Sequence, residues 1–325
     1  MKLNLEHMVA PTEIAYDPDH LSFPDFLLLA DRADEADVGL VGVPYAGGTF
    51  RLVGTNLGPV GIRKGLAYFR SYSTELELDL CDYIKVVDLG NLDVVWNNAA
   101  ETFGRVDDLV KKMLRAKLRP LILGGDHSIS QQILKTFCTE VKERTGIIWV
   151  DNHLDSMSDY QGDCNYCGCP LFNIMNELSE YIHPENVVHL GSRGFHNSSA
   201  MWKNMRKMGV HVIKAEEIQM QGIQAVMDRA LELARRGVSR LYLTLDIDVG
   251  EGVFTPGTQC PRPGGLYPWQ MLYMVRRVGQ AGADGFDLME VAPTVDIADG
   301  TIMLAASLVL EFLAGLAWRK AQSKK

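Results

Sequence analysis

The chain lacks the long uncharged apolar runs that mark a membrane span. None of its segments reaches the ~18 consecutive apolar residues, free of charge, from which a spanning helix is recognised. Its N-terminal segment contains no apolar core of the signal-peptide type. The six cysteines are irregularly spaced in a chain of 325 residues, which is too long to depend on disulfides. We therefore expect a reduced, cytoplasmic protein without a membrane partner.

A surplus of basic charge is also lacking. Lysine and arginine total 32 against 41 aspartates and glutamates, and the formal net charge is −9. Because no basic patch is present, we expect no nucleic-acid partner. An acidic balance favours small cationic substrates through the field in an acidic cleft. The hydrophobic content of 47% is sufficient for a large folded core.

No repeat, low-complexity segment or Ser/Gly/Pro-rich linker divides the chain. We therefore predict a single catalytic domain over residues 36–325. Residues 1–35 are predicted to form an N-terminal extension that could serve packing or assembly.

The chain alternates between buried-strand patterns and helical patterns. Eight apolar, β-branched-rich runs predict strands at residues 38–43, 83–89, 119–124, 146–151, 186–191, 210–215, 240–247 and 285–291. Helical spacing is clearest at residues 59–69, 101–117, 129–144, 222–236 and 301–318. Such alternation predicts a three-layer αβα fold with a mainly parallel sheet of about eight strands.

Potential metal ligands follow three of these predicted strands. They occur in LILGGDHS (121–128), IIWVDNHLDS (147–156) and LYLTLDID (241–248), and they are His127, Asp151, His153, Asp155, Asp246 and Asp248. In open parallel sheets, ligands bind at the carboxyl ends of the strands, so all six are expected at one edge. Four carboxylates at one place repel one another unless cations neutralise them. Two imidazoles and four carboxylates suit a pair of divalent ions.

Each segment also has a simpler interpretation. Ser128 could cap a helix that begins near Ile129, which would make GGDHS only a strand-to-helix turn. Acidic residues in a loop are usually solvated. Here, however, they directly follow apolar runs, where unpaired burial is costly. The three segments together therefore favour a binuclear metal hydrolase.

With these motifs the chain resembles the ureohydrolases, the family of arginase, agmatinase and their relatives. The resemblance rests on GGDHS (124–128), DNHLD (151–155), TLDID (244–248) followed by TPGT (255–258), and DLMEVAPTVD (287–296). The segment GGTFRLVGTNLGPVGIRKGL (47–66) resembles the agmatinase-like branch in particular. The resemblance extends from about residue 38 to residue 318 and implies an arginase-like fold.

Transferred residue by residue, the resemblance implies two metal sites that share two bridging carboxylates. One ion would be held by His127, Asp151, Asp155 and Asp246, and the other by Asp151, His153, Asp246 and Asp248. Glu290 would bind the guanidinium group of the substrate. The resemblance further implies two divalent ions per chain, Mn²⁺ first and Ni²⁺ as the alternative. It also implies a homo-oligomer, a trimer or hexamer. A mixed assembly with a paralogous subunit stays open on a separate ground, the replacement of the family's shuttle histidine.

Two departures from the family pattern concern the chemistry. An HGTP-like motif usually supplies a proton-shuttling histidine, but the aligned stretch here reads CGCP (167–170), which puts Cys167 at that position. Relatives commonly have Asp–Pro after the second acidic pair, whereas this chain has Glu251–Gly252. The standard proton route is therefore in question.

Other residues near these motifs carry less specific signals. Cys164, Cys167 and Cys169 have a CxxCxC spacing, but no second ligand pair is nearby, so lining a pocket is favoured over a structural zinc site. His196 follows the fifth predicted strand at the same edge and is either a pocket residue or an exposed loop histidine.

The predicted reaction is metal-assisted hydrolysis of a guanidino compound to urea, or a substituted urea, and an amine. Glu290 would position the guanidinium, Asp155 would orient the nucleophile, and the proton donor would be Asp155, Cys167 or His196.

An agmatinase- or guanidinobutyrase-like enzyme is the first expectation, and a nickel-dependent guanidine or biguanide hydrolase is the alternative. A formimino-group hydrolase also remains open, as does a supporting subunit of a mixed oligomer. Substrate choice is expected to lie in loops 45–58, 156–170 and 192–200, with Arg193 as a possible partner for a substrate carboxylate.

Overall fold

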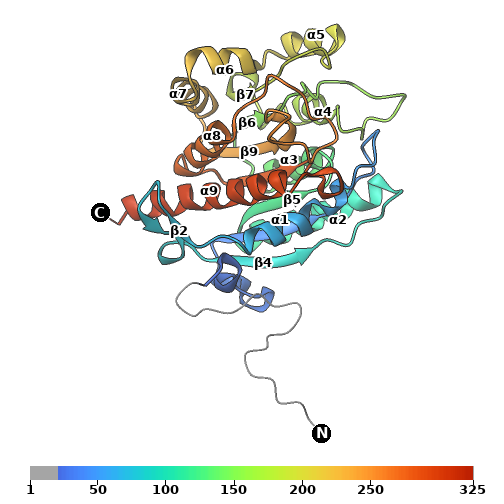
Figure 1. The fold of residues 1–325 in the computed structure, drawn as a ribbon. Helices are drawn as coiled ribbons and strands as arrows, with labels where there is room; N and C mark the ends of the chain where they lie inside the picture. Colours follow the sequence, from blue (N-terminus) through green and yellow to red (C-terminus); the bar gives the residue numbers. More distant parts are fainter. Residues whose placement is uncertain (1–20, 325) are drawn as a thin grey trace.

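The computed structural model describes residues 21–324 and shows an eight-stranded parallel sheet between two layers of helices (Figure 1). The strand order is β4-β1-β5-β10-β9-β6-β7-β8. The strands are β1 (Val38–Val43), β4 (Val86–Asn91), β5 (Arg119–Gly124), β6 (Thr145–Val150), β7 (Val187–Leu190), β8 (His211–Ile213), β9 (Arg240–Asp246) and β10 (Gly285–Met289). The predicted three-layer α/β class and all eight predicted strands are confirmed.

The continuous hydrophobicity of the strands follows from their position between two helical layers. Every residue of β1 and of β6 is buried, which is the pattern expected of a parallel strand covered on both faces. A Cβ at Gly285 would meet the ring of Tyr242 on the neighbouring strand, so this small residue allows the two strands to pair with a bulky tyrosine between them.

The helices form two layers, one on each face of the sheet. One hydrophobic cluster contains residues of α1 (Gly58–Leu66), α6 (Ala215–Gln221), α7 (Ile223–Ala234), α8 (Pro268–Gln280) and α9 (Gly300–Gln322). The other contains residues of α2 (Ala99–Arg115), α3 (Ile129–Val141), α4 (Pro170–Glu177) and α5 (Ser199–Met208). The five predicted helices correspond to α1, α2, α3, α7 and α9, whereas α4, α5, α6 and α8 were not among those predicted.

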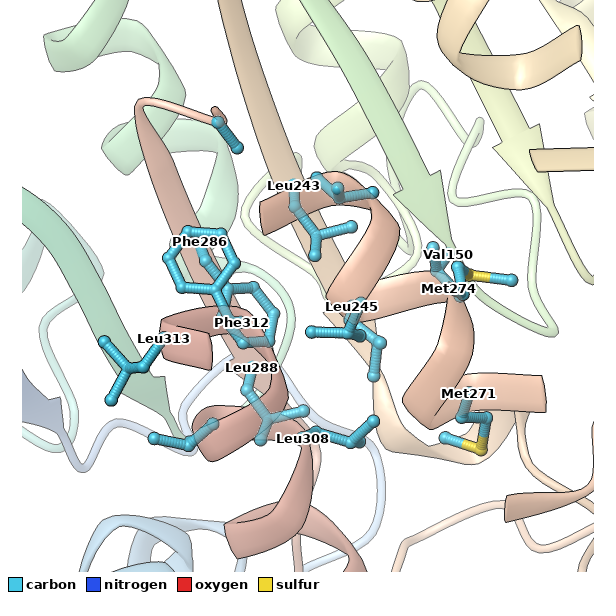
Figure 2. Close-up of a cluster of buried hydrophobic side chains, with 14 of the residues drawn as sticks. Val150, Leu243, Leu245, Met271, Met274, Phe286, Leu288, Leu308, Phe312 and Leu313 are labelled. Atoms are coloured by element: carbon cyan, nitrogen blue, oxygen red, sulfur yellow. The ribbon is translucent and has the colours of Figure 1, made fainter. Parts of the chain in front are cut away.

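The core on the α8 and α9 side fixes the position of the two strands beneath it. Figure 2 shows Leu243 and Leu245 of β9 and Phe286 of β10 facing side chains from these helices. The rings of Phe286 and Phe312 are 5.0 Å apart between centroids, and both are fully buried. Deleting either ring would cost about 3–5 kcal/mol of stability.

Helix α9 has the length and composition of a membrane span, with a mean hydropathy of 1.9 over its 18-residue window. In the structure, 72% of that window is buried inside the protein. Its apolar surface therefore belongs to the core, and it lies along α8 and α1 (Figure 1).

Shorter elements complete the described chain. A two-stranded hairpin joins β2 (Tyr72–Ser73) to β3 (Leu78–Asp79), and 3₁₀ turns occur at Phe23–Phe26, Ala30–Glu35, Thr55–Leu57, Leu80–Asp82, Pro184–Asn186, Ile247–Val249 and Pro293–Val295.

Part of the predicted N-terminal extension packs on the domain. Phe23 is buried and its N–H donates to the carbonyl of Phe69, while Leu28 bridges to Val87 of β4. The rest of the extension, residues 1–20, lies outside the described residues. The boundary at residue 36 and the role of the extension in assembly remain predictions.

Candidate metal centre

The strand order brings the predicted ligands to one edge of the sheet. Strands β5, β10, β9 and β6 are consecutive neighbours in its centre. The carboxyl end of each is followed by one part of the site, which comprises His127 after β5, Glu290 after β10, Asp246 and Asp248 at the end of β9, and Asp151, His153 and Asp155 after β6. The parallel direction of the four strands therefore places all these side chains at the same edge.

His127 lies among three carboxylates. Its Nδ1 is 3.1 Å from Asp151 Oδ2, 3.2 Å from Asp155 Oδ2 and 3.6 Å from Asp246 Oδ2. All four side chains are almost completely buried. These are the four residues that the resemblance assigned to one ion.

A chain of hydrogen bonds on its far side orients the His127 ring. Its Nε2 lies 2.9 Å from Thr244 Oγ1, and the Thr244 hydroxyl donates to Asp287 Oδ1 at 2.5 Å. Because that hydroxyl proton is engaged with Asp287, Thr244 can only accept from His127. The proton of the neutral ring then resides on Nε2, and the Nδ1 lone pair faces the carboxylates. Trp149 stacks on the ring at 4.8 Å.

His153 faces the second group of carboxylates. Its Nδ1 is 3.0 Å from Asp248 Oδ2 and 3.6 Å from Asp151 Oδ1. Ligand atoms of Asp151, His153, Asp246 and Asp248 all lie within 4.8 Å of one another, which matches the second predicted ligand set. His189, to which the sequence assigned no role, contacts the His153 carbonyl through Nε2 at 2.6 Å and so holds this loop.

Two residues of the site adopt left-handed backbone conformations that are unusual outside glycine. Asp155 has φ 43° and Glu290 has φ 65°. Backbone hydrogen bonds hold both in place, since the Asp155 carbonyl accepts from Phe172 at 3.1 Å and the Glu290 N–H donates to Gly125 at 2.8 Å. Such strain costs of order 1–3 kcal/mol and concentrates at functional sites.

The carboxylates strongly perturb one another. Burial, together with the charge of Asp151, raises the pKa of Asp155 to about 7. Burial also raises the pKa of Asp246 well above its ordinary value, with added repulsion from Asp248 and Asp151. Burial opposes ionisation of Asp151 too, but hydrogen bonds from the two imidazoles outweigh it and lower that pKa. So dense a group of acids is stable as carboxylates only with added positive charge.

Within the part of the chain that the structure describes, two of the predicted ligand residues each have a buried side-chain atom with no hydrogen-bond partner. These atoms are His127 Nδ1 and Asp155 Oδ2, which face each other at 3.2 Å. Buried polar atoms are rarely left unpaired unless a ligand or an ion engages them. The orphaned lone pairs and the surrounding oxygen and imidazole donors therefore fit a divalent cation of the Mn²⁺ or Ni²⁺ type.

Glu290 is tied to the site by both of its oxygens. Oε1 accepts from the backbone N–H of His127 at 2.9 Å, and Oε2 accepts from Gln259 Nε2 at 3.0 Å. Burial raises the pKa of Glu290 well above its ordinary value, followed by the charges of Asp246 and Asp126. A cation bound against Glu290 would favour its ionised form.

A cavity of about 100 Å³ opens onto these groups. Cys167 and His196, both predicted from sequence as site residues, line it. Cys167 is buried, its Sγ is 3.7 Å from Gln259 Nε2, and burial raises its thiol pKa well above the ordinary value. His196 is exposed, and its Nε2 accepts from Arg262 Nε at 2.8 Å.

The GGDHS turn owes its shape to close packing rather than to a helix cap. A Cβ on Gly125 would collide with the backbone of Tyr45, so only glycine fits there. Ser128 does not cap α3, because its hydroxyl is engaged by Asp126. The Asp126 carboxylate also accepts from Gly48 N at 2.7 Å, which ties the loop after β1 to the site.

The sequence did not identify three residues that the structure adds to the site. They are Thr244, Asp287 and Gln259. The signal for Gln259 was available, since it directly follows the TPGT motif at residues 255–258. Thr244 and Asp287 open the motifs TLDID and DLMEVAPTVD, but the sequence gave them no role, because their contact depends on the pairing of β9 with β10.

Two sequence-based alternatives are not supported by the structure. Arg193, considered as a partner for a substrate carboxylate, donates instead to the carbonyls of Pro263, Val249, Asp248, Gly250 and Arg262. Among residues 21–324, the groups close enough to hold a metal do not include the three cysteines of the CxxCxC segment. The additional group found there joins His196 and Cys260 to His153.

Comparison with known proteins yields a consistent result. The model of the arginase family matches residues 36–315. The chain is 31% identical over 281 residues to the formimidoylglutamase of Halalkalibacterium halodurans, covering 85% of this chain and 86% of that protein. It is 29% identical to the guanidinopropionase of Pseudomonas aeruginosa, covering 96% and 98%.

The fold agrees with a solved member of the same group. The crystal structure of formimidoylglutamase from Bacillus subtilis superposes with a TM-score of 0.88 at 26% identity and covers 96% of both chains. The ureohydrolase resemblance, the αβα fold and the enzyme class are thereby confirmed. The chain belongs to the arginase family of hydrolases.

Proposed function

We propose that this chain hydrolyses a C–N bond of a guanidino compound and releases urea, or a substituted urea, and an amine. The observation that carries the proposal is the convergence of six ligand-type side chains at one edge of the sheet, with Glu290 directly after β10 beside them. Two of the six, His127 and Asp155, have a buried atom without a hydrogen-bond partner. The guanidinopropionase among the relatives supports a guanidino substrate.

The residues divide into two ion-binding sets that share Asp151 and Asp246. His127 and Asp155 complete one set, and His153 and Asp248 complete the other. Two divalent ions held there supply Lewis acidity and a reactive water near neutral pH. Oxygen and imidazole donors accept both Mn²⁺ and Ni²⁺, so Mn²⁺ remains the first choice and Ni²⁺ the alternative.

Glu290 is the proposed partner of the substrate's guanidinium group. Its carboxylate borders the cavity beside Asp246, and its oxygens retain lone pairs after accepting from His127 and Gln259. A guanidinium that donates to Glu290 is held with its carbon toward the carboxylate cluster. The buried cavity limits competing water, which strengthens this charge-assisted contact.

Among the three predicted proton donors, the geometry favours Asp155. The Nε2 of His196 already accepts from Arg262, and burial followed by the charges of Arg262 and His153 lowers the pKa of His196. The Cys167 thiol is buried close to Glu290, where a thiolate would be repelled. Asp155 lines the cavity and has an oxygen without a protein partner. It can orient the attacking water and pass the proton to the departing amine.

The direct test is urea release by purified protein loaded separately with Mn²⁺ and Ni²⁺. The panel comprises agmatine, 4-guanidinobutyrate, 3-guanidinopropionate, arginine, guanidine and dimethylbiguanide, and amine release is followed in parallel. Turnover of any of these compounds supports the proposal and identifies the metal. Silence across the panel with two ions bound per chain contradicts it and favours a formimino substrate or a supporting subunit.

A further inference from the structure

In the described range, residues 21–324, the only charged side chains that line the cavity are those that would bind metal and guanidinium. Its charged lining consists of Asp155, Asp246, Asp248 and Glu290. The remaining lining residues, apart from the two ligand histidines, are Phe50, Met157, Tyr166, Cys167, Gly168, His196, Met201, Gln259 and Cys260. A substrate substituent that extends away from the guanidinium therefore meets apolar, sulfur-containing and neutral polar surface.

Two aromatic side chains, Phe50 and Tyr166, belong to this lining. The ring of Tyr166 stacks on Tyr160 at 4.5 Å between centroids, and Phe50 lies 6.4 Å from Tyr166. Phe50 is 57% exposed, which places it at the mouth of the cavity. The volume of about 100 Å³ is small beside the ~300–1,000 Å³ of most ligand pockets. The site therefore suits a short substituent.

The nearby arginines do not supply a partner for a substrate carboxylate. Arg193 donates to backbone carbonyls from all three of its guanidinium nitrogens. Arg262 donates to His196 and to the carbonyl of Pro261. Arg51 donates to the Gln259 carbonyl at 3.2 Å and lies outside the cavity lining. A substrate carboxylate at the far end of the cavity would be desolvated without a positively charged side chain of the lining to pair with it.

We infer that the substrate is a guanidinium-type cation carrying a short, uncharged, apolar substituent, and not a guanidino acid or an amino-tailed guanidine. This inference rests on the proposed function and specifies its substrate class. A tail ammonium, such as that of agmatine, would also lie against neutral side chains without a carboxylate of its own. The acidic groups act on the guanidinium end of the substrate, and the neutral side chains of the lining select its substituent.

The test compares compounds that share the guanidinium and differ in tail charge. For the Mn²⁺- and Ni²⁺-loaded chain, kcat/KM is measured with propylguanidine, 3-guanidinopropionate, pentylguanidine and agmatine. We expect the kcat/KM of propylguanidine to exceed that of 3-guanidinopropionate by at least ~100-fold, because burying a carboxylate without a counter-charge is costly. Pentylguanidine should exceed agmatine by about 10-fold. A preference for either charged compound overturns the inference while leaving the proposed function intact.

Introducing a cation at the lining should change the preference. Met157→Arg is expected to reduce the ratio of propylguanidine to 3-guanidinopropionate kcat/KM by at least ~10-fold, whereas the matched Met157→Leu should leave that ratio within about threefold. Met157 is half-buried, so an arginine there could disturb folding. Phe50→Arg, at the exposed mouth of the cavity, therefore provides a second variant. If neither arginine changes the ratio, the lining does not select the tail and the inference fails.

Two further results distinguish a failure of this inference from a failure of the proposed function. If the native chain prefers 3-guanidinopropionate and Arg51→Ala abolishes that preference, Arg51 is the carboxylate partner and the inference is wrong. If none of the four compounds yields urea, the proposed function fails on this panel. Calorimetric binding of the same compounds to the metal-loaded chain then decides the inference. Tighter binding of propylguanidine supports it, and equal or tighter binding of 3-guanidinopropionate overturns it.

Discussion

Replacing Thr244 by valine should weaken metal binding without removing a ligand. The substitution deletes the hydroxyl that links His127 Nε2, at 2.9 Å, to Asp287 Oδ1. His127 is 1% exposed, so its ring N–H would lose a partner that water cannot readily replace. An unsatisfied buried group costs about 1–3 kcal/mol. Loss of the group that orients a metal-binding histidine typically reduces metal affinity by about 10–100-fold.

The measurement is calorimetric titration of the metal-free protein with Mn²⁺, together with thermal unfolding. We expect Thr244→Val to weaken binding of one of two ions by about 10–100-fold. Thr244→Ser retains a hydroxyl and should bind nearly as the native chain does. Thr136→Val is the control for loss of a buried threonine hydroxyl elsewhere, since Thr136 contacts Asp107 in the helical layer. The reasoning is refuted if Thr244→Val binds both ions with native affinity, or if Thr136→Val weakens them equally.

Four further substitutions test separate parts of the account. Asp155→Ala should abolish turnover while metal remains partly bound, and full activity with normal metal content would contradict its role. Glu290→Gln keeps the shape but loses the charge, so kcat/KM for the guanidino substrate should fall by about 10–100-fold in steady-state assays. Cys167→Ser should lower kcat by much less than the ~100-fold that removal of a general acid causes. A fall of ~100-fold or more would show that the thiol is a proton donor. Burial raises the pKa of Glu311 from 4.5 to about 7 despite the Arg276 ion pair at 2.8 Å, so the native state favours its protonated form. Native stability should therefore fall by about 2 kcal/mol as the pH rises from 5 to 8, after allowance for partial exposure, and denaturant unfolding of Glu311→Gln should lack this fall.

The fold was predictable because the strands have a distinctive composition. A parallel strand covered on both faces must be apolar throughout, so runs such as VGLVGV at 38–43 are recognisable without knowledge of their neighbours. Helix α8 was also recognisable, since Met271, Met274, Val275 and Val278 have helical spacing and are all buried. The helical spacing of these residues was therefore visible in the sequence, although α8 was not among the predicted helices.

The predicted ligands converge because acidic and imidazole residues directly follow buried strands. What the sequence could not provide is the order of strands in space. Strand β10 lies between β5 and β9, although it is the last strand along the chain. That insertion places Asp287 beside Thr244 and Glu290 beside His127, and neither contact has a local sequence pattern. The use of Arg193 within backbone contacts is likewise visible only in three dimensions.

The most direct test of the central claim is a titration of the metal-free protein with Mn²⁺ in which bound metal and urea release are followed together, using the best guanidino substrate of the panel, with Ni²⁺ as a parallel series. We expect two ions to bind per chain and urea release to reach its maximum only when both are bound. Urea release that is complete with one ion, or that proceeds after the metal has been removed, would contradict this expectation.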